Sequence, residues 1–273
     1  MRRTIFLTLL AVIAICTYAQ DIEQKNVPAV LVNAFQLKFA NTEDVDWELK
    51  EGVYLVDFEL NDKDNTVWMD DKGNILKHKQ ELWESEVPGY VIATIRSKCE
   101  FFDLNDAERT EEGDKVVYYI NFERGSKDCD FWLDGKGNLI KFKQELKKSE
   151  IPETILTSIR NQYGSFDIDD AEKTEAGGKV IIKLDGEIND KDHSFWFDAK
   201  VSMLKHTQDL RNSEIPVPVM KSISSLYTGY EIRDADKIEE GGKTTYDLEL
   251  RKSKEKIHVI FDQKGEVLEV ISN

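Results

Sequence analysis

Short runs in which apolar and polar residues alternate recur along the chain, separated by polar turns. The clearest run is 116–122, and similar runs occupy 53–58, 180–184 and 244–250. Strict alternation predicts a β-strand with one buried face. Before each run, about a dozen residues follow a proline with helical spacing, and a proline is well suited to a first helical turn. In one copy the apolar positions of this helix are Val91, Ile92, Ile95, Cys99 and Phe102.

The pattern belongs to a repeat with one constant interval. The segment Trp68–Asn74 recurs at 132–138, at 196–200 and, more loosely, at 260–266. A Ser-Glu-Val/Ile-Pro junction recurs at the same interval, at 85–88, 149–152 and 213–216, and the first copy is four residues shorter before its second strand. In-register recurrence of this kind indicates an array of one supersecondary unit. The predicted units are 20–84, 85–148, 149–212 and 213–273.

Within each unit the order is one helix followed by four strands. A short strand precedes the alternating one, and an Asp-x-Lys-Gly type turn separates the tryptophan strand from the last one. This order predicts an α+β fold, in which tandem units each place one helix on one face of a four-stranded antiparallel sheet. No long low-complexity linker separates the units, so we expect them to pack side by side or in pairs.

Alternation also assigns side chains to the two faces of each sheet. The apolar residues of the tryptophan strand must lie under the helix, so Trp68, Trp132 and Trp196 lie on the opposite, largely polar face. Leu55, Tyr119 and Ile181 of the neighbouring strand are predicted on the same face. Large aromatic side chains on an open face are typical of a protein-binding surface. The alternative is that this face packs against another unit's sheet or forms a second small core.

Two cysteines follow the N-terminal region. Cys99 lies on the apolar stripe of its helix, and Cys129 lies on the sheet face beneath that helix. They are therefore candidates for a disulfide within the second unit, as expected for an even cysteine count in an oxidising compartment. Closing this ~31-residue loop would stabilise the fold by roughly 3–4 kcal/mol. A pair of buried thiols is the alternative.

Residues 1–19 have the composition of a secretory signal peptide. Arg2 and Arg3 precede an apolar run that is too short to span a membrane, and Ala19 offers a small residue for cleavage. This segment is thus predicted to be removed, which places the protein in the periplasm or outside the cell, with no integral membrane segment. Cys16 is a candidate for a lipid anchor, although Ile15 before it is larger than lipoprotein peptidases prefer.

Charge and chemistry narrow the function further. The net charge is −16, or about −18 without the leader, which disfavours nucleic acid as a partner. We find no zinc, phosphate-loop or nucleophile-elbow motif, so we expect no catalytic residues, no metal and no cofactor. His78 and His206 lie two repeat intervals apart at equivalent positions, which favours a structural or surface role. The acidic turn at 61–65 lacks the glycine and glutamate of an EF-hand loop, so turn formation explains it better than calcium binding.

The unit resembles a known family. Its Asp-Trp-Glu strand at 45–48, its Tyr-x-Val-Asp-Phe strand at 54–58 and its Trp-x-Asp-x-x-Gly turn at 68–73 look like the PepSY-like, beta-lactamase-inhibitor-like periplasmic proteins of Bacteroidetes. The resemblance covers the mature chain once per unit and is weakest in the fourth unit, where Ile260 replaces the tryptophan. It implies paired sheets with a concave, aromatic-rich surface, and it allows units 1–2 and 3–4 to form two PepSY-like domains. No inhibitor residue of the family carries over by motif.

Together these observations predict a secreted or periplasmic, non-enzymatic binding protein. Its open aromatic sheet face would engage a protein or peptide partner, and inhibition of that partner is one form that such binding can take. The acidic net charge favours a partner with a basic patch. An envelope sensor that binds a small ligand or calcium is the alternative function.

Overall fold

The computed structural model describes residues 20–272, which form four helix-plus-sheet units in chain order. Each helix starts directly after the junction proline, as the sequence predicts. The first unit contains α1 (Ala29–Lys38), β2 (Glu43–Lys50), β3 (Val53–Glu59), β4 (Asp64–Met69) and β5 (Ile75–Glu81), preceded by the short β1 (Gln20–Asp21). The second contains α2 (Gly89–Lys98), β6 (Asp103–Glu112), β7 (Lys115–Glu123), β8 (Asp128–Asp134) and β9 (Leu139–Glu145).

The third and fourth units repeat this order. The third contains α3 (Glu153–Tyr163), β10 (Asp167–Ala176), β11 (Lys179–Glu187), β12 (Asp192–Asp198) and β13 (Met203–Asp209). The fourth contains α4 (Val217–Leu226), β14 (Glu231–Glu240), β15 (Lys243–Lys252), β16 (Glu255–Asp262) and β17 (Val267–Ser272). Tandem repetition of one helix followed by four strands is therefore confirmed.

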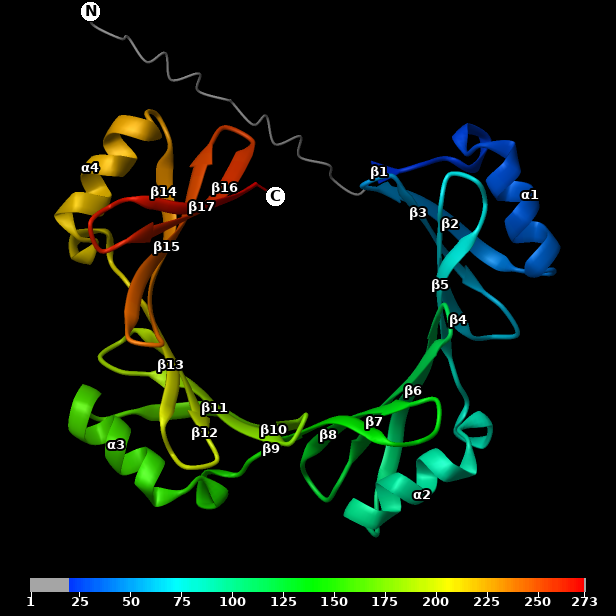
Figure 1. Ribbon diagram of the computed structural model, residues 1–273, viewed down its shortest axis with the longest axis horizontal. Coiled ribbons are helices and arrows are strands. Elements are labelled where there is room, and N and C mark those ends of the chain that lie inside the picture. Colours follow the sequence, from blue (N-terminus) through cyan, green and yellow to red (C-terminus); the bar gives the residue numbers. More distant parts are fainter. Residues whose placement is uncertain (1–19, 273) are drawn as a thin grey trace, which may run out of the picture.

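The strands do not form four separate sheets, and in this respect the predicted fold is wrong. Every strand pairs antiparallel with the next one along the chain, including β5 with β6, β9 with β10 and β13 with β14. One continuous meander results. It curves into an open ring with the four helices on the outside, and its two ends, β1 and β17, lie at the opening (Figure 1). Backbone pairing between units leaves no side-chain signature, which is why the repeat alone did not predict it.

The three junctions between units are built alike. At each one the fourth strand of a unit forms a ladder of five residue pairs with the first strand of the next unit, for example from Lys77↔Glu112 to Glu81↔Glu108. At each junction the glutamate of the Ser-Glu-Val/Ile-Pro motif forms an ion pair with a lysine of the preceding unit. Glu86 accepts a hydrogen bond from the Trp83 amide and two from the buried Lys63 ammonium, at 2.7 and 2.9 Å, which hold the pKa of Glu86 below its usual value.

Each helix covers the outward face of its own four strands, and a separate apolar core lies beneath it. In the first unit Leu31 and Phe35 of α1 pack on Val56, Val67 and Met69 of the sheet. Corresponding residues fill the other three cores. The apolar face predicted from alternation is thus the helix-covered face in all four units. The four cores are separate from one another, one beneath each helix.

Cys99 and Cys129 lie in the core of the second unit, at the end of α2 and in β8 respectively. Both are free, buried thiols in this structure. Burial, and then the neighbouring Cys99, raise the pKa of the Cys129 thiol to about 11. The two side chains therefore meet where the sequence placed them, and their oxidation to a disulfide stays a prediction.

The predicted leader, 1–19, and Cys16 within it lie outside the described residues. Among the helices of the described part, none is both long and apolar enough to cross a membrane. The suggested division into two domains of two units each stays a prediction; in the structure the central junction, β9 with β10, has the same ladder as the two outer ones.

Candidate functional site

The inner face of the curved sheet is the face that the helices leave uncovered (Figure 1). All six residues predicted for partner binding lie there and are partly exposed: Trp68, Trp132, Trp196, Leu55, Tyr119 and Ile181. The strand alternation positions them, since Trp132, for instance, stands between the buried Phe131 and Leu133 of β8. These residues form the inner aromatic surface of the protein.

A lysine from the following strand stacks on each tryptophan. The Lys77 ammonium lies 4.3 Å from the ring centroid of Trp68, and the Lys141 ammonium lies 4.2 Å from that of Trp132. These distances are well within the range of cation–π attraction. The lysine stems also cover part of each ring, so the tryptophans are held in one orientation while part of each ring stays accessible.

The third unit carries two lysines on its tryptophan. The ammonium groups of Lys205 and Lys183 lie 5.0 and 5.5 Å from the Trp196 ring centroid. Lysine at positions 77, 141 and 205 recurs with the same interval as the tryptophans, so the repeat itself contained the signal for these cations. The sequence interpretation did not include the pairing of these lysines with tryptophan.

The strand register separates Ile181 from the other two predicted neighbours. Leu55 pairs directly with Trp68, and Tyr119 pairs directly with Trp132, with ring centroids 5.2 Å apart. Ile181 instead pairs with Asp198, and Lys183 is the residue opposite Trp196. Ile181 is therefore on the predicted face, but it lies one inward-facing position away from the aromatic cluster of its unit.

Between the tryptophans the inner face carries pairs of opposite charge across the junctions. Lys79 of β5 donates to Glu108 of β6 at 2.9 Å, and Lys143 of β9 pairs with Glu172 of β10 at 2.6 Å. These contacts raise the pKa of each lysine. Both pairs bridge two units, so they fasten adjacent units together on the side that would meet a partner.

The third junction lacks this cation. Thr207 stands at the position of Lys79 in the first unit and Lys143 in the second, and Asp236 stands at the position of Glu108 and Glu172. Asp236 lies directly opposite Asp209 on the neighbouring strand. Burial, the charge of Asp234 and a hydrogen bond with Asp209 raise the pKa of Asp236 to about 7. This junction therefore places two carboxyl groups opposite each other without the lysine that the other two junctions supply.

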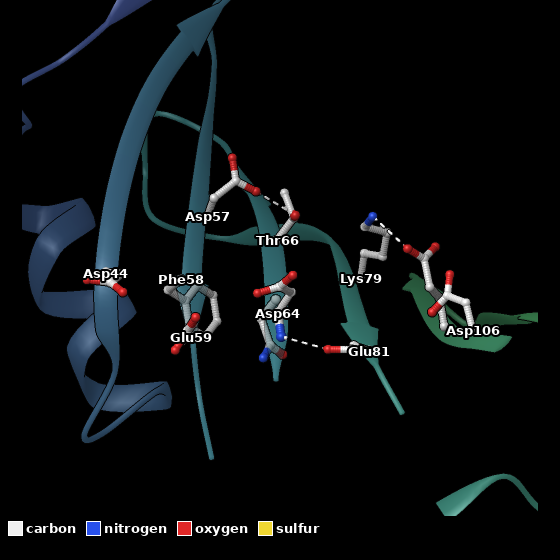
Figure 2. Close-up of a pocket in the computed structure, with 11 residues that line it drawn as sticks. Asp44, Asp57, Phe58, Glu59, Asp64, Thr66, Lys79, Glu81 and Asp106 are labelled. Carbon is white, nitrogen blue, oxygen red and sulfur yellow. Dashed lines mark hydrogen bonds and ion pairs between the residues drawn. The ribbon is translucent and has the colours of Figure 1, made fainter. Parts of the chain in front are cut away.

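An acidic hollow of about 510 Å³ lies on the inner side of the first junction (Figure 2). Seven carboxylates and a single cation, Lys79, are among its lining residues: Asp44, Asp57, Phe58, Glu59, Asp64, Asn65, Thr66, Lys79, Glu81, Asp106 and Glu108. Asp57 accepts a 2.6 Å hydrogen bond from the Thr66 hydroxyl. Burial, and then the charge of Glu108, raise the pKa of Asp106. The hollow suits cationic groups, and the acidic turn at 61–65 contributes Asp64 and Asn65 to its lining.

His78, His193 and His206 lie on the other, helix-covered side, whereas His258 lies on the inner face, between the buried Ile257 and Val259 of β16. His206 is buried; its two ring nitrogens lie 2.9 Å from His193 Nδ1 and 2.9 Å from Glu239 Oε2. His78 contacts Asn65 Oδ1 at 3.0 Å in the equivalent place of the first unit. Burial lowers the pKa of His193 to about 4. Within residues 20–272 no group of three or more His, Cys, Asp or Glu side chains has the arrangement of a metal site.

Comparison with solved structures finds likenesses that each span less than half of this chain. A BLIP-like protein of Bacteroides fragilis is 21% identical, with 43% of this chain and 85% of that chain covered and a TM-score of 0.37. A protein of Bacteroides eggerthii described as one of the "putative periplasmic proteins" is 14% identical, with 43% and 88% covered and a TM-score of 0.38. A DUF2874 family protein of Bacteroides uniformis is 16% identical, with 44% and 88% covered and a TM-score of 0.37.

No curated protein matches the chain. One family model does, and it carries the description "Putative beta-lactamase-inhibitor-like, PepSY-like". It matches three overlapping windows, 52–141, 117–205 and 182–269, and each window begins about one unit after the previous one. The windows together span most of the chain, so this protein belongs to the beta-lactamase-inhibitor-like, PepSY-like family.

Proposed function

We propose that this protein is a non-catalytic binding protein of the cell envelope, and that its inner aromatic surface engages a protein or peptide partner. The observation that carries the proposal is the recurrence of a lysine-stacked tryptophan at 68, 132 and 196, one unit apart on the uncovered sheet face. Tryptophan supplies a large contact area with few rotamers, and it is among the residues that dominate binding energy at protein interfaces.

The stacked lysines support this function because they pre-organise the rings. A ring that is already held in its bound orientation loses less side-chain entropy when a partner binds. The fourth unit has Ile260 in place of the tryptophan and Glu269 in place of the lysine. The proposed surface therefore covers the first three units and ends before β16, which favours an elongated partner that follows the curve of the sheet.

Charge defines the partner further. The acidic hollow at the first junction and the carboxyl pair at the third both lie on the inner face, and the net charge is −16. A partner that combines apolar side chains with exposed lysine or arginine would satisfy both features, and such complementarity mainly raises the association rate. Whether binding inhibits the partner depends on what the partner does, and the family description makes β-lactamases the first enzymes to assay.

The experiment is a quantitative capture from a native envelope extract. The chain is immobilised as wild type, as the triple variant Trp68→Ala, Trp132→Ala, Trp196→Ala, and as Trp83→Ala. Trp83 is 49% exposed but precedes α2 and lies outside the inner strands, so it is a matched control. We expect one or more proteins to be retained by wild type and by Trp83→Ala and lost at least tenfold with the triple variant. Equal retention by all three would refute the proposal.

An envelope sensor for calcium or a small cationic ligand is the second candidate, and the acidic hollow is the observation that favours it. A ligand that binds only the folded chain must raise its melting temperature. Under the leading proposal, millimolar calcium leaves the melting temperature unchanged. A rise that disappears in Asp64→Asn would transfer the function to the sensor.

A further inference from the structure

We propose that the outer edge of β17 is a self-association surface, through which two copies of this chain pair antiparallel into a symmetric dimer. The inference is independent of the proposed function of the inner face. It starts from the position of β17, which pairs with β16 on one edge and with no described strand on the other. In the other three units the equivalent strand edge is always occupied by the first strand of the next unit.

The composition of β17 is unlike that of a protected edge. Native edge strands are usually blunted by lysine, proline or a bulge that keeps other strands away. β17 has no lysine or proline, and its bulge next to Val267 also occurs in β5, β9 and β13, each of which still pairs with the next strand. The inner-facing positions of the fourth strands carry Lys77 and Lys79 in the first unit, and these positions become Glu269 and Ile271 in β17. The strand with an open edge is thus the one in which both lysines are replaced. Its sequence at these positions is Leu268-Glu269-Val270-Ile271.

Exposure shows that β17 is incompletely covered. Val270 stands at the position of Phe142 and His206, which are only 6% and 1% exposed, whereas Val270 is 50% exposed. Leu268 and Ile271 are 57% and 42% exposed. A strand laid along this edge would continue the sheet in the way that every internal junction already does, and it would bury aliphatic side chains on both faces.

The opposite end of the array does not offer the complementary edge. β1 already pairs with β2 through Gln20↔Leu49 and Asp21↔Glu48, and the Ile22 amide donates to the Trp47 carbonyl, just as the Leu82 amide donates to the Ala107 carbonyl at the first internal junction. The hairpin between β2 and β3 also turns after Lys50↔Val53. It lacks the two further residue pairs that Glu111 and Glu112 make in the second unit.

Head-to-tail joining of copies and closure of the ring on itself are therefore disfavoured, because β1 occupies part of the edge that they would use and the shorter hairpin removes another part. The remaining edge with matching length and polarity is β17 of a second copy. An antiparallel pair centred on Val270 places Glu269 opposite Ile271 of the other copy and keeps the two glutamates from facing each other. Because the contact uses the same patch on both copies, it closes at two chains rather than forming a filament.

The test is sedimentation equilibrium of the purified chain over a wide range of concentrations, together with Val270→Lys and Ile271→Lys. The matched control is Leu37→Lys, which places the same charge on an aliphatic residue of α1 that is 88% exposed. We expect reversible dimers for wild type and for Leu37→Lys, and at least a tenfold weaker dimer for each β17 variant. Circular dichroism of each variant verifies that the sheet is intact.

Three outcomes would overturn the proposal. Wild-type chain that stays monomeric at its highest soluble concentration excludes the dimer. Assemblies that grow beyond two chains indicate head-to-tail joining instead. Dimers that persist unchanged in folded Val270→Lys and Ile271→Lys place the contact on another surface. A β17 variant that does not fold is replaced by Val270→Thr, which keeps strand propensity while removing aliphatic surface, and which must also weaken the dimer.

Discussion

Replacing Asp236 by asparagine should stabilise the folded protein at neutral pH. In the structure Asp236 faces Asp209 across the third junction, and Thr207 stands where the other junctions supply a lysine. Asparagine can still donate a hydrogen bond to the Asp209 carboxylate, as the protonated Asp236 does, but it carries no charge to lose. The substitution therefore makes permanent the uncharged form that this site favours.

The size of the effect follows from the raised pKa. A pKa that moves from 3.8 to about 7 on folding corresponds to roughly 4 kcal/mol at neutral pH. Asp236 is partly exposed and forms a hydrogen bond with Asp209, so we expect about half, roughly 2 kcal/mol. The folded chain holds this proton more tightly than the unfolded chain, so wild-type stability falls as pH rises from 4 to 7. The advantage of Asp236→Asn should appear over that same interval.

The assay is urea unfolding followed by far-ultraviolet circular dichroism at pH 4 and at pH 7.5. We expect Asp236→Asn to exceed wild type at pH 7.5 and to match it at pH 4. The control is Glu172→Gln at the equivalent place of the second junction, where Lys143 is present. Removing that ion pair should be neutral or slightly destabilising at pH 7.5. The reasoning is refuted if Asp236→Asn is no more stable than wild type at pH 7.5. It is also refuted if the gain at pH 4 is as large as the gain at pH 7.5.

Three further predictions concern the cores and the ion pair between Glu86 and Lys63 at the first junction. Wild type should lose stability as pH falls from 6.5 to 4, because the pKa of the buried His193 imidazole is lowered to about 4 and the unfolded chain therefore protonates this histidine first. His193→Asn should remove up to about 3 kcal/mol of that loss. Urea unfolding at both pH values measures the difference. Glu86→Gln leaves the buried Lys63 ammonium without its counter-ion and should lower the free energy of unfolding by about 1–3 kcal/mol in the same assay. The same Glu→Gln change at an exposed glutamate should leave that free energy unchanged. Protein refolded in an oxidising buffer should show no titratable thiol from Cys99 and Cys129 after denaturation; two free thiols would establish the reduced pair.

Alternation and the repeat interval predicted much of this structure because both reflect burial. The residues under each helix, such as Val67 and Met69, alternate with the tryptophan between them, and a single strand has only two faces. The faces of Trp68, Trp132 and Trp196 could therefore be assigned from sequence alone. The proline junctions likewise mark the start of each helix, since proline is tolerated in a first turn.

Features that depend on backbone pairing between distant residues could not be predicted in this way. The ladder between β5 and β6 joins backbone groups, which every residue carries, so nothing in the side chains distinguished one continuous sheet from four. The position of Ile181 was predicted from alternation without counting the strand register, and Lys183 proved to be the residue opposite Trp196. The acidic hollow combines residues from two units, and neither unit alone contains it.

The identical junction ladders have an evolutionary consequence. Recombination between two copies of the repeat within such a gene would add or remove the codons of one whole unit at once, and the new neighbours would meet in a register that already exists three times in the chain. An insertion of a single residue within a strand would instead turn every later side chain of that strand to the wrong face. Related chains should therefore differ in length by whole units, with the curvature of the sheet setting how many units fit before its ends meet.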